Sequence, residues 1–143
     1  MTGRPGEEST AGESQAGAEL TVREPLTDPE LNGLFSASWP GHRDTSFAPV
    51  LARSLSWVAA RRAGRLVGYV NVAWDGGAHA FVLDTTVHPD ERRHGLGVRL
   101  VRAAAEAARG AGAQWLHVDY EPHLGEFYAR CGFRPTAAGL LAL

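Results

Sequence analysis

The spacing of apolar and polar residues changes several times along the chain, and each change predicts a new secondary-structure element. Residues 19–23 alternate as a half-buried strand does, and apolar runs of strand length follow in the middle of the chain. From Gly95 to Arg109 the apolar residues recur with helical spacing. The predicted order is β-α-α-β-β-β-α-β-α-β-β, which is typical of one mixed α/β domain. Strands are expected at residues 19–23, 56–61, 65–74, 79–87, 115–120, 133–135 and 139–143, and helices at 28–35, 46–55, 95–109 and 123–131.

Turn and capping residues predict where these elements begin and end. The segment Thr27-Asp28-Pro29-Glu30 offers a capping residue, an early proline and a glutamate three residues after the cap, which is typical of a helix start. Arg62-Ala63-Gly64 and Asp75-Gly76-Gly77 predict tight turns between three consecutive antiparallel strands. Gly110 and Gly112 follow the long helix and predict its end. We therefore expect a mixed, mostly antiparallel central sheet flanked by helices.

Composition limits the class of protein. The 143 residues are 44% apolar and 21% charged, which is typical of a single globular domain. No run approaches the ~18 apolar residues of a membrane span, and the N-terminus lacks a signal-peptide core. We therefore expect a cytoplasmic protein without a membrane partner. Residues 1–19 carry four glutamates and one arginine, a net charge of −3. They predict a disordered acidic tail, followed by one domain over residues 20–143.

The types of charged residue exclude several chemistries. All 14 cationic side chains are arginine, so an enzyme that uses a lysine Schiff base or a phosphate-loop lysine is excluded. Residues 20–143 carry 13 arginines and 12 acidic residues, and this near-neutral balance argues against a nucleic-acid partner. Cys131 is the only cysteine, so an internal disulfide is excluded, and we expect it to pack rather than to react. No histidine pair has a usual zinc spacing, so no metal is expected.

The segment 87–98 contains the strongest chemical signal. A predicted strand ends at its first residue, and Gly95 and Gly97 stand where the long helix begins. The first N–H groups of a helix lack partners and face the positive end of the helix dipole. Glycines let a phosphate approach that backbone closely, and Arg92 and Arg93 add positive charge. The segment therefore predicts a diphosphate site, although it lacks the third glycine of a dinucleotide fingerprint and the lysine of a phosphate loop.

Two motifs resemble those of a known family. Arg92-Arg93-His94-Gly95-Leu96-Gly97 resembles the Arg/Gln-x-x-Gly-x-Gly/Ala signature of the GNAT family of acetyl-CoA-dependent N-acetyltransferases, and Val87-x-Pro89 fits the residues before it. Phe127-Tyr128-Ala129-Arg130-Cys131-Gly132-Phe133 resembles the family's aromatic-Tyr-x-x-x-Gly-Phe segment. The resemblance covers residues 20–143, including the order of elements, and implies a GNAT acetyltransferase fold.

The resemblance also implies an activity. A GNAT protein transfers an acetyl group from acetyl-CoA to a primary amine by direct attack, without an acyl-enzyme. A small-molecule amine is favoured over a peptide N-terminus as the acceptor, and similar proteins are commonly homodimers. The alternative is a non-catalytic acyl-CoA-binding regulatory module of the same fold.

Roles for individual residues follow from the same resemblance. Backbone amides of residues 93–98 would hold the coenzyme A diphosphate, and the strand end at residues 85–87 would pair with the pantetheine arm. Tyr128 would donate a proton to the departing thiolate. The family often has an asparagine shortly before this tyrosine, and residues 119–123 contain none. The residues implied for cofactor binding are Thr85, Thr86, Val87, Arg92, Arg93, His94, Gly95, Leu96, Gly97 and Val98.

The general base has several candidates. His117 lies in the strand before the tyrosine helix, where some family members have a glutamate base, and histidine suits the role because the pKa of an unperturbed imidazole is near neutrality. Asp84 stands at the end of the preceding strand, where many small-amine members have an acid. The role could also fall to Asp119, to Glu121 or to a chain of waters. If alternation continues along the strand, Asp84 shares one face with Ala80, Val82 and Thr86.

The first two helices and their connection are where this fold shapes acceptor specificity. Aromatic residues beside an acid would suit a small cationic amine. The candidate acceptor residues there are Trp39, His42, Arg43, Asp44 and Phe47, with Tyr69 and Trp74 on the sheet.

Overall fold

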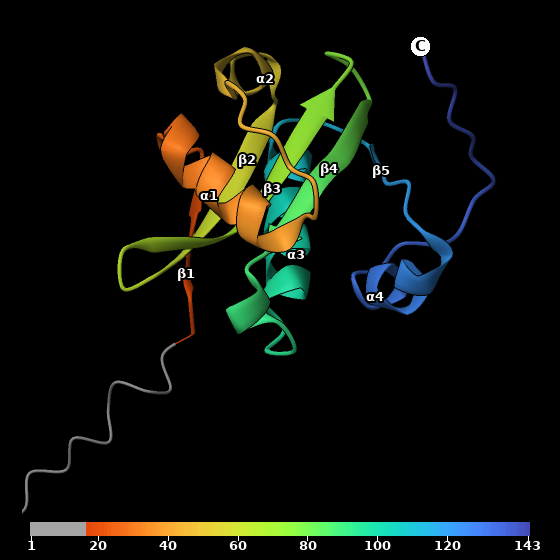
Figure 1. The fold of residues 1–143 in the computed structure, drawn as a ribbon. Helices are drawn as coiled ribbons and strands as arrows, with labels where there is room; N and C mark the ends of the chain where they lie inside the picture. The colour runs from red at the N-terminus through yellow and green to blue at the C-terminus, as the bar shows by residue number, and fades with distance from the viewer. Residues whose placement is uncertain (1–16) are drawn as a thin grey trace, which may run out of the picture.

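A five-stranded sheet lies at the centre of the fold, with its strands in chain order β1-β2-β3-β4-β5 (Figure 1). The structure is a computed structural model that describes residues 17–143. The first four strands are antiparallel, and β5 runs parallel to β4. This confirms the mixed, mostly antiparallel sheet expected from the sequence. The strands are β1 (Glu19–Val22), β2 (Ser56–Arg62), β3 (Arg65–Trp74), β4 (His79–Val87) and β5 (Trp115–His117).

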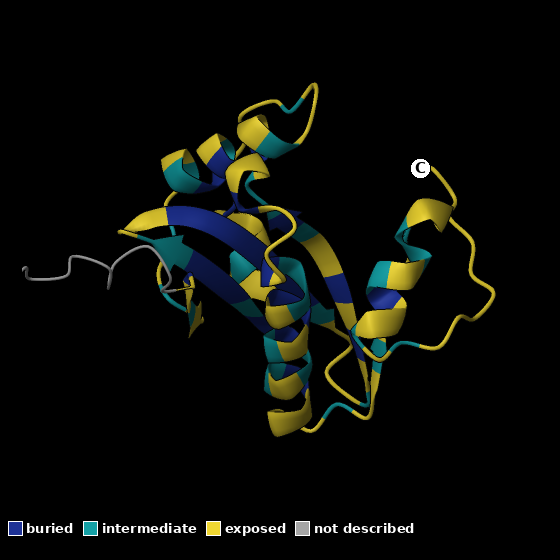
Figure 2. Ribbon diagram, turned by 90° about the horizontal axis from the view of Figure 1, so that it is seen from below, coloured by how far each residue is buried: buried dark blue, intermediate teal, exposed yellow. Residues whose placement is uncertain are grey.

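Helices cover both faces of the sheet. Figure 2 shows the sheet between a layer formed by α1 and α2 and a second layer formed by α3, with α4 beyond the β5 edge. Among residues 17–143, no helix combines the length and the apolar content that crossing a membrane requires. The helices are α1 (Asp28–Ser38), α2 (Ala48–Arg53), α3 (Leu96–Gly110) and α4 (Gly125–Arg130), with the short 3₁₀ helices η1 (Pro89–Glu91) and η2 (Pro122–Leu124).

The two faces of β2 and β3 support separate hydrophobic clusters. Val58, Val70 and Val72 are fully buried in the cluster that α3 covers with Leu96 and Leu100. The opposite face packs against α1 through Leu31, Leu34, Phe35, Phe47, Ala59, Leu66 and Tyr69. Because β3 is buried on both faces, it is the rigid centre from which β4 is positioned.

Gly68 is where α3 approaches the sheet most closely. A Cβ atom there would lie 2.8 Å from Leu100 Cδ1 and 3.1 Å from Ala60 Cβ. Leu100 is fully buried and cannot swing away, so we expect Gly68→Ala to lower the free energy of unfolding by about 1–3 kcal/mol. Urea unfolding measures this change. Gly33→Ala in α1, where a Cβ meets no atom within 4 Å, is the matched control and should not lose stability. Equal unfolding midpoints for wild type and Gly68→Ala would contradict the close packing.

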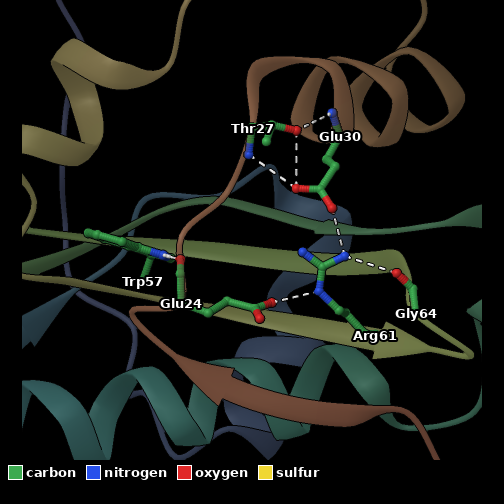
Figure 3. Close-up of polar contacts among 6 residues, drawn as sticks. All are labelled: Glu24, Thr27, Glu30, Trp57, Arg61 and Gly64. Atoms are coloured by element: carbon green, nitrogen blue, oxygen red, sulfur yellow. Dashed lines mark hydrogen bonds and ion pairs between the residues drawn. The ribbon is translucent and has the colours of Figure 1, made fainter.

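Arg61 joins the β1–α1 connection to the sheet (Figure 3). Its Nε lies 2.9 Å from Glu24 Oε1, and its Nη1 lies 2.8 Å from Glu30 Oε1. The second carboxylate oxygen of Glu30 accepts a hydrogen bond of 3.1 Å from the backbone N–H of Thr27. The Thr27 hydroxyl in turn accepts from the Glu30 N–H, which confirms the capping box predicted at residues 27–30. Glu30 therefore completes the cap of α1 and also pairs with Arg61 of the sheet.

We expect Glu30→Gln to lower the free energy of unfolding by about 1 kcal/mol at neutral pH. The hydrogen bond from Arg61, followed by that from Thr27, lowers the pKa of Glu30. A carboxylate with a lowered pKa stabilises the fold above its unfolded pKa, and this contribution is lost as the pH falls through the folded pKa. The difference between wild type and variant should therefore shrink in acid, as chemical unfolding between pH 7 and pH 3 will measure. A difference that stays constant over that range would contradict the role of the charge.

The structure differs from the sequence prediction mainly at its C-terminal end. The strands predicted at residues 133–135 and 139–143 are wrong, because residues 131–143 contain no strand. The strand predicted at residues 115–120 stops at His117. A strand needs a hydrogen-bonding partner, and beyond His117 the chain leaves β4. The predicted tail falls largely outside the described residues, since residues 1–16 are not described, while Ala18 is buried in the core.

Candidate active site

An extra residue interrupts the pairing near the end of β4. Asn71 of β3 pairs with Leu83, whereas Tyr69, two residues earlier, pairs with Thr86, three residues later. β4 therefore bulges between these pairs. Asp84 lies in the bulge with φ of 56°, a left-handed conformation that few residues other than glycine adopt. The bulge re-aims the side chains of β4 where the sequence placed candidate site residues.

The bulge also reverses the faces of β4. Val82 is buried in the cluster under α3, whereas the Thr86 hydroxyl accepts a 3.1 Å hydrogen bond from the indole of Trp39, at the end of α1. The expectation that Val82, Asp84 and Thr86 share one face is therefore wrong, because the extra residue breaks the period of two. Thr86 faces the α1 layer, beside its partner Tyr69.

β4 and β5 separate a short distance before the bulge. The two strands pair only from His79 to Phe81 and from Trp115 to His117. After β5 the chain turns away from β4 and leads into α4 (Figure 1). His117 therefore stands on the last paired position before the strands part.

Tyr128 of α4 reaches back toward β4. It is buried, stacks on Tyr120 with ring centroids 4.8 Å apart, and contacts the ring edges of Phe127 and Phe133. Burial raises the pKa of the Tyr128 hydroxyl, and the nearby Thr85 side chain offsets part of that rise. The hydroxyl therefore stays protonated at neutral pH. Tyr128 and Thr85, both predicted from the sequence, come together across the point where β4 and β5 separate.

Asp84 is the acidic residue of the bulge itself. Asp84 is an exposed residue by surface area, yet the protein packed around its carboxylate raises the pKa of Asp84 above the ordinary value. Burial, and to a smaller extent the negative charge of Asp84, raise the pKa of Tyr69. An aspartate with a raised pKa is a better proton acceptor than an ordinary one.

The other base candidates have different surroundings. His117 Nε2 lies 2.7 Å from His79 Nδ1, and the His117 ring stacks on Phe81 at 4.7 Å. Asp119 is close enough to Tyr128 for its charge to raise the pKa of that hydroxyl slightly. Glu121 precedes η2, and its side chain makes no capping hydrogen bond to that helix. No group of three or more histidine, cysteine or acidic side chains in residues 17–143 is arranged to hold a metal ion.

A groove of about 620 Å³ follows the start of α3 and the adjacent face of α4. Among the described residues, Glu91 is the one acidic side chain that lines the groove, and Arg62 Nε lies 2.7 Å from its Oε1. The groove is therefore strongly positive. Thr85 and Thr86 do not line it, whereas the remaining predicted cofactor residues do. The lining residues are Val87, Glu91, Arg92, Arg93, His94, Gly95, Leu96, Gly97, Val98, Arg99, Arg102, Phe127 and Arg130.

The backbone at the start of α3 fits a phosphate ligand. Gly95 caps the helix in a left-handed conformation, with φ of 75°. The N–H groups of residues 96–98 have no partner within the helix, since its first turn supplies none. A Cβ atom on Gly97 would lie 2.9 Å from Phe127 Cε2, so this glycine also allows α4 to pack against α3. The positive groove and these amides suit the diphosphate of coenzyme A.

Sequence reasoning missed three arginines of this groove. Arg99 and Arg102 lie on the polar side of α3, where their spacing resembles an ordinary solvated face. Arg102 donates a 3.1 Å hydrogen bond to the backbone carbonyl of Arg130, which joins α3 to the end of α4. The contact between two helices is not visible in their separate patterns. Arg130 lies inside the aromatic-tyrosine motif, and that position was the one sequence signal for an arginine of the groove.

The candidate acceptor residues divide between two faces. Trp39 and Tyr69 lie near the bulge. His42, in the α1–α2 connection, forms a hydrogen bond in which its Nε2 lies 2.9 Å from Asn32 Oδ1. Phe47 is buried in the core. Trp74 pairs with a residue packed under α3, so it does not line the face on which Tyr69 lies.

Known proteins are similar to this chain in sequence and in fold. The Acetyltransferase (GNAT) family model matches residues 27–133. Mycothiol acetyltransferase from Thermomonospora curvata is 33% identical over 114 residues, which cover 72% of this chain and 37% of that protein. Glucosamine 6-phosphate N-acetyltransferase 1 from Oryza sativa subsp. japonica is 40% identical over 73 residues, which cover 51% and 36%. The chain thus spans about a third of the length of these relatives.

Solved structures agree with the family match. A putative acetyltransferase from Deinococcus radiodurans R1 superposes with a TM-score of 0.74 at 26% identity, covering 89% of each chain. A GNAT family acetyltransferase from Streptococcus pneumoniae TIGR4 has a TM-score of 0.75 at 22% identity, covering 88% of this chain and 97% of that one. With a family model that matches most of its length, the chain belongs to the GNAT family of acetyltransferases.

Proposed function

We propose that the protein is an N-acetyltransferase that moves the acetyl group of acetyl-CoA to the primary amine of a small molecule. The observation that carries the proposal is the position of Tyr128 and Thr85 where β4 and β5 separate, beside the positive groove at α3. Two relatives carry small molecules in their names, mycothiol and glucosamine 6-phosphate. An aminoglycoside N-acetyltransferase of the same fold, with a TM-score of 0.69, was solved with CoA. A homodimer and a cytoplasmic location stay predictions.

The chain's own residues bind the cofactor and carry out the proton transfers. Acetyl-CoA supplies the activated acetyl thioester. Backbone amides of residues 96–98 and the arginines of the groove bind its phosphates. Asp84 takes a proton from the acceptor ammonium and so frees the lone pair of the amine. Tyr128 gives its phenolic proton to the departing sulfur and regains one from the acetylated nitrogen.

We place Asp84 ahead of His117 as the base. Burial raises the pKa of Asp84, and it lies in the bulge beside Thr85. His117, in contrast, forms a hydrogen bond with His79 and stacks on Phe81. Only the ionised carboxylate accepts a proton, so kcat should fall as the pH drops through this raised pKa, at a higher pH than for an ordinary aspartate.

We expect Asp84→Asn to lower kcat by about 100-fold and to remove this acid limb of the pH profile. His117→Gln should keep kcat within a few-fold of wild type. Steady-state rates of thiol release between pH 5 and pH 9 measure both variants. If His117→Gln loses the activity and Asp84→Asn keeps it, the base is assigned to the wrong residue.

Thermal unfolding with acetyl-CoA, CoA, ATP and NADH at equal concentrations tests the binding step. A ligand at about 100 times its Kd adds roughly 2.7 kcal/mol of stability, which raises Tm by several degrees. We expect a rise with both CoA species and none with NADH. Binding of CoA without acetylation of any amine in a broad panel would instead support a non-catalytic acyl-CoA-binding module.

A further inference from the structure

Two histidines from different strands meet at the β4–β5 pair. His79 Nδ1 lies 2.7 Å from His117 Nε2, and the centroids of the two rings are 5.0 Å apart. The residues are 38 positions apart in the chain, so no sequence motif joins them. The parallel register brings them together, because His79 pairs with Trp115, and Phe81 pairs with His117. Residues two apart on a strand share a face, so both imidazoles lie on the same face of the sheet.

Both imidazoles are held in place and are open to solvent. The His117 ring stacks on Phe81, with centroids 4.7 Å apart and planes 19° apart. His79 begins β4, where its backbone N–H donates a 3.2 Å hydrogen bond to the carboxylate of Asp75. That carboxylate adds a negative charge at the start of β4, which favours a cation nearby. His79 and His117 are both exposed residues, so an ion from solvent can reach the two facing nitrogens.

The chemistry of the facing nitrogens is that of a pair of metal ligands. In the hydrogen bond, one imidazole donates a proton and the other offers a lone pair. When the donor ring carries its proton on its outer nitrogen instead, each ring presents a lone pair to the space between them. Neutral imidazole nitrogens of this kind bind transition metals.

The distance between the nitrogens indicates which metal fits. An imidazole nitrogen binds a divalent transition metal at about 2.0 Å, so two nitrogens at a right angle lie about 2.8 Å apart, and two at a tetrahedral angle about 3.3 Å apart. The observed 2.7 Å is close to the right angle of a tetragonal ion. Copper(II) is the tetragonal ion that nitrogen ligands bind most tightly. Within residues 17–143 no third histidine, cysteine or acidic side chain completes the set, so water would fill the remaining positions.

We infer that His79 and His117 form a two-histidine site for a tetragonal divalent transition metal, with copper(II) as the preferred ion. The site joins β4 to β5 along their paired residues, before the strands separate. A bound ion therefore stabilises this edge of the sheet. The site requires neither acetyl-CoA nor the proposed function.

Calorimetric titration of the full chain with copper(II), without acetyl-CoA, tests the site. We expect one ion per chain in the first binding step. His79→Gln and His117→Gln should each weaken that step at least about tenfold, because each removes one of the two protein ligands. His123→Gln removes an exposed histidine of η2 and is the matched control, which should bind copper(II) as wild type does. Magnesium, which prefers oxygen ligands, should not bind.

Two further measurements use the copper-loaded protein. The electron paramagnetic resonance spectrum of wild type should be tetragonal, with coupling to two imidazole nitrogens. Saturating copper(II) should raise Tm by several degrees over protein in a chelator, and neither His79→Gln nor His117→Gln should show this rise. Equal affinity in wild type and both variants, or coupling to a single nitrogen, would overturn the inference and show adventitious binding only. Because these experiments contain no acetyl-CoA, either result leaves the proposed function standing.

Discussion

Replacing Tyr128 with phenylalanine is expected to lower kcat by about 100- to 1,000-fold while CoA binding is kept. The variant retains the ring that stacks on Tyr120 and packs against Phe133, so the fold of α4 should survive. It loses only the phenolic proton that we propose Tyr128 gives to the departing sulfur. Pre-steady-state and steady-state thiol release, together with CoA titration by calorimetry, measure the two effects separately.

Tyr120→Phe is the matched control for that experiment. Tyr120 stacks on Tyr128 with ring planes 22° apart, so this substitution removes a hydroxyl from the same aromatic cluster. We expect Tyr120→Phe to keep kcat within a few-fold of wild type. Full activity of Tyr128→Phe over the whole pH range would remove Tyr128 from the mechanism.

Gly97→Val is expected to weaken CoA binding on the order of 100-fold, or about 2.7 kcal/mol. Even a Cβ atom at this position would lie 2.9 Å from Phe127 Cε2 and 3.7 Å from Val87 Cγ2. The larger side chain therefore pushes α4 away from α3 and fills the groove that the phosphates need. CoA titration and Tm together measure the loss of binding and the loss of packing.

Two further variants separate these effects. Gly110→Ala lies at the far end of the same helix, where a Cβ meets no atom within 4 Å, and should leave CoA affinity unchanged. Combining Gly97→Val with Phe127→Leu makes space between the helices, so Tm should recover while CoA affinity stays low. Recovery of affinity in this double variant would show that Gly97 matters for helix packing alone.

Elements with strong local signals were predictable from the sequence. The turn after Arg62 is a two-residue hairpin in which Ala63 and Gly64 both have positive φ, as the turn residues indicated. The capping box of α1 and the strand β4 also formed as expected. The C-terminal strands did not form, because a short apolar segment carries no information about whether a sheet edge is free to receive it. Leu140 and Leu141 remain more than four-fifths exposed.

The candidate site was predictable only where its residues are consecutive. The loop before α3 has a recognisable glycine pattern, and the groove indeed follows it. Arg102 joins the groove through a contact with the end of α4, which no local pattern encodes. The bulge at Asp84 reversed the expected faces of β4, because one inserted residue shifts every following side chain. This shift placed Thr86 beside Tyr69.

The most direct test of the central claim is to incubate the protein with acetyl-CoA and a panel of alkylamines and to quantify both free thiol and N-acetylated amine by mass spectrometry. We expect thiol and acetylated amine to appear in equal amounts, and Asp84→Asn and Tyr128→Phe to slow both equally. Thiol release without acetylated amine would indicate thioester hydrolysis. That result, or the absence of either product from protein that binds CoA, would contradict the assignment of this chain as an amine acetyltransferase.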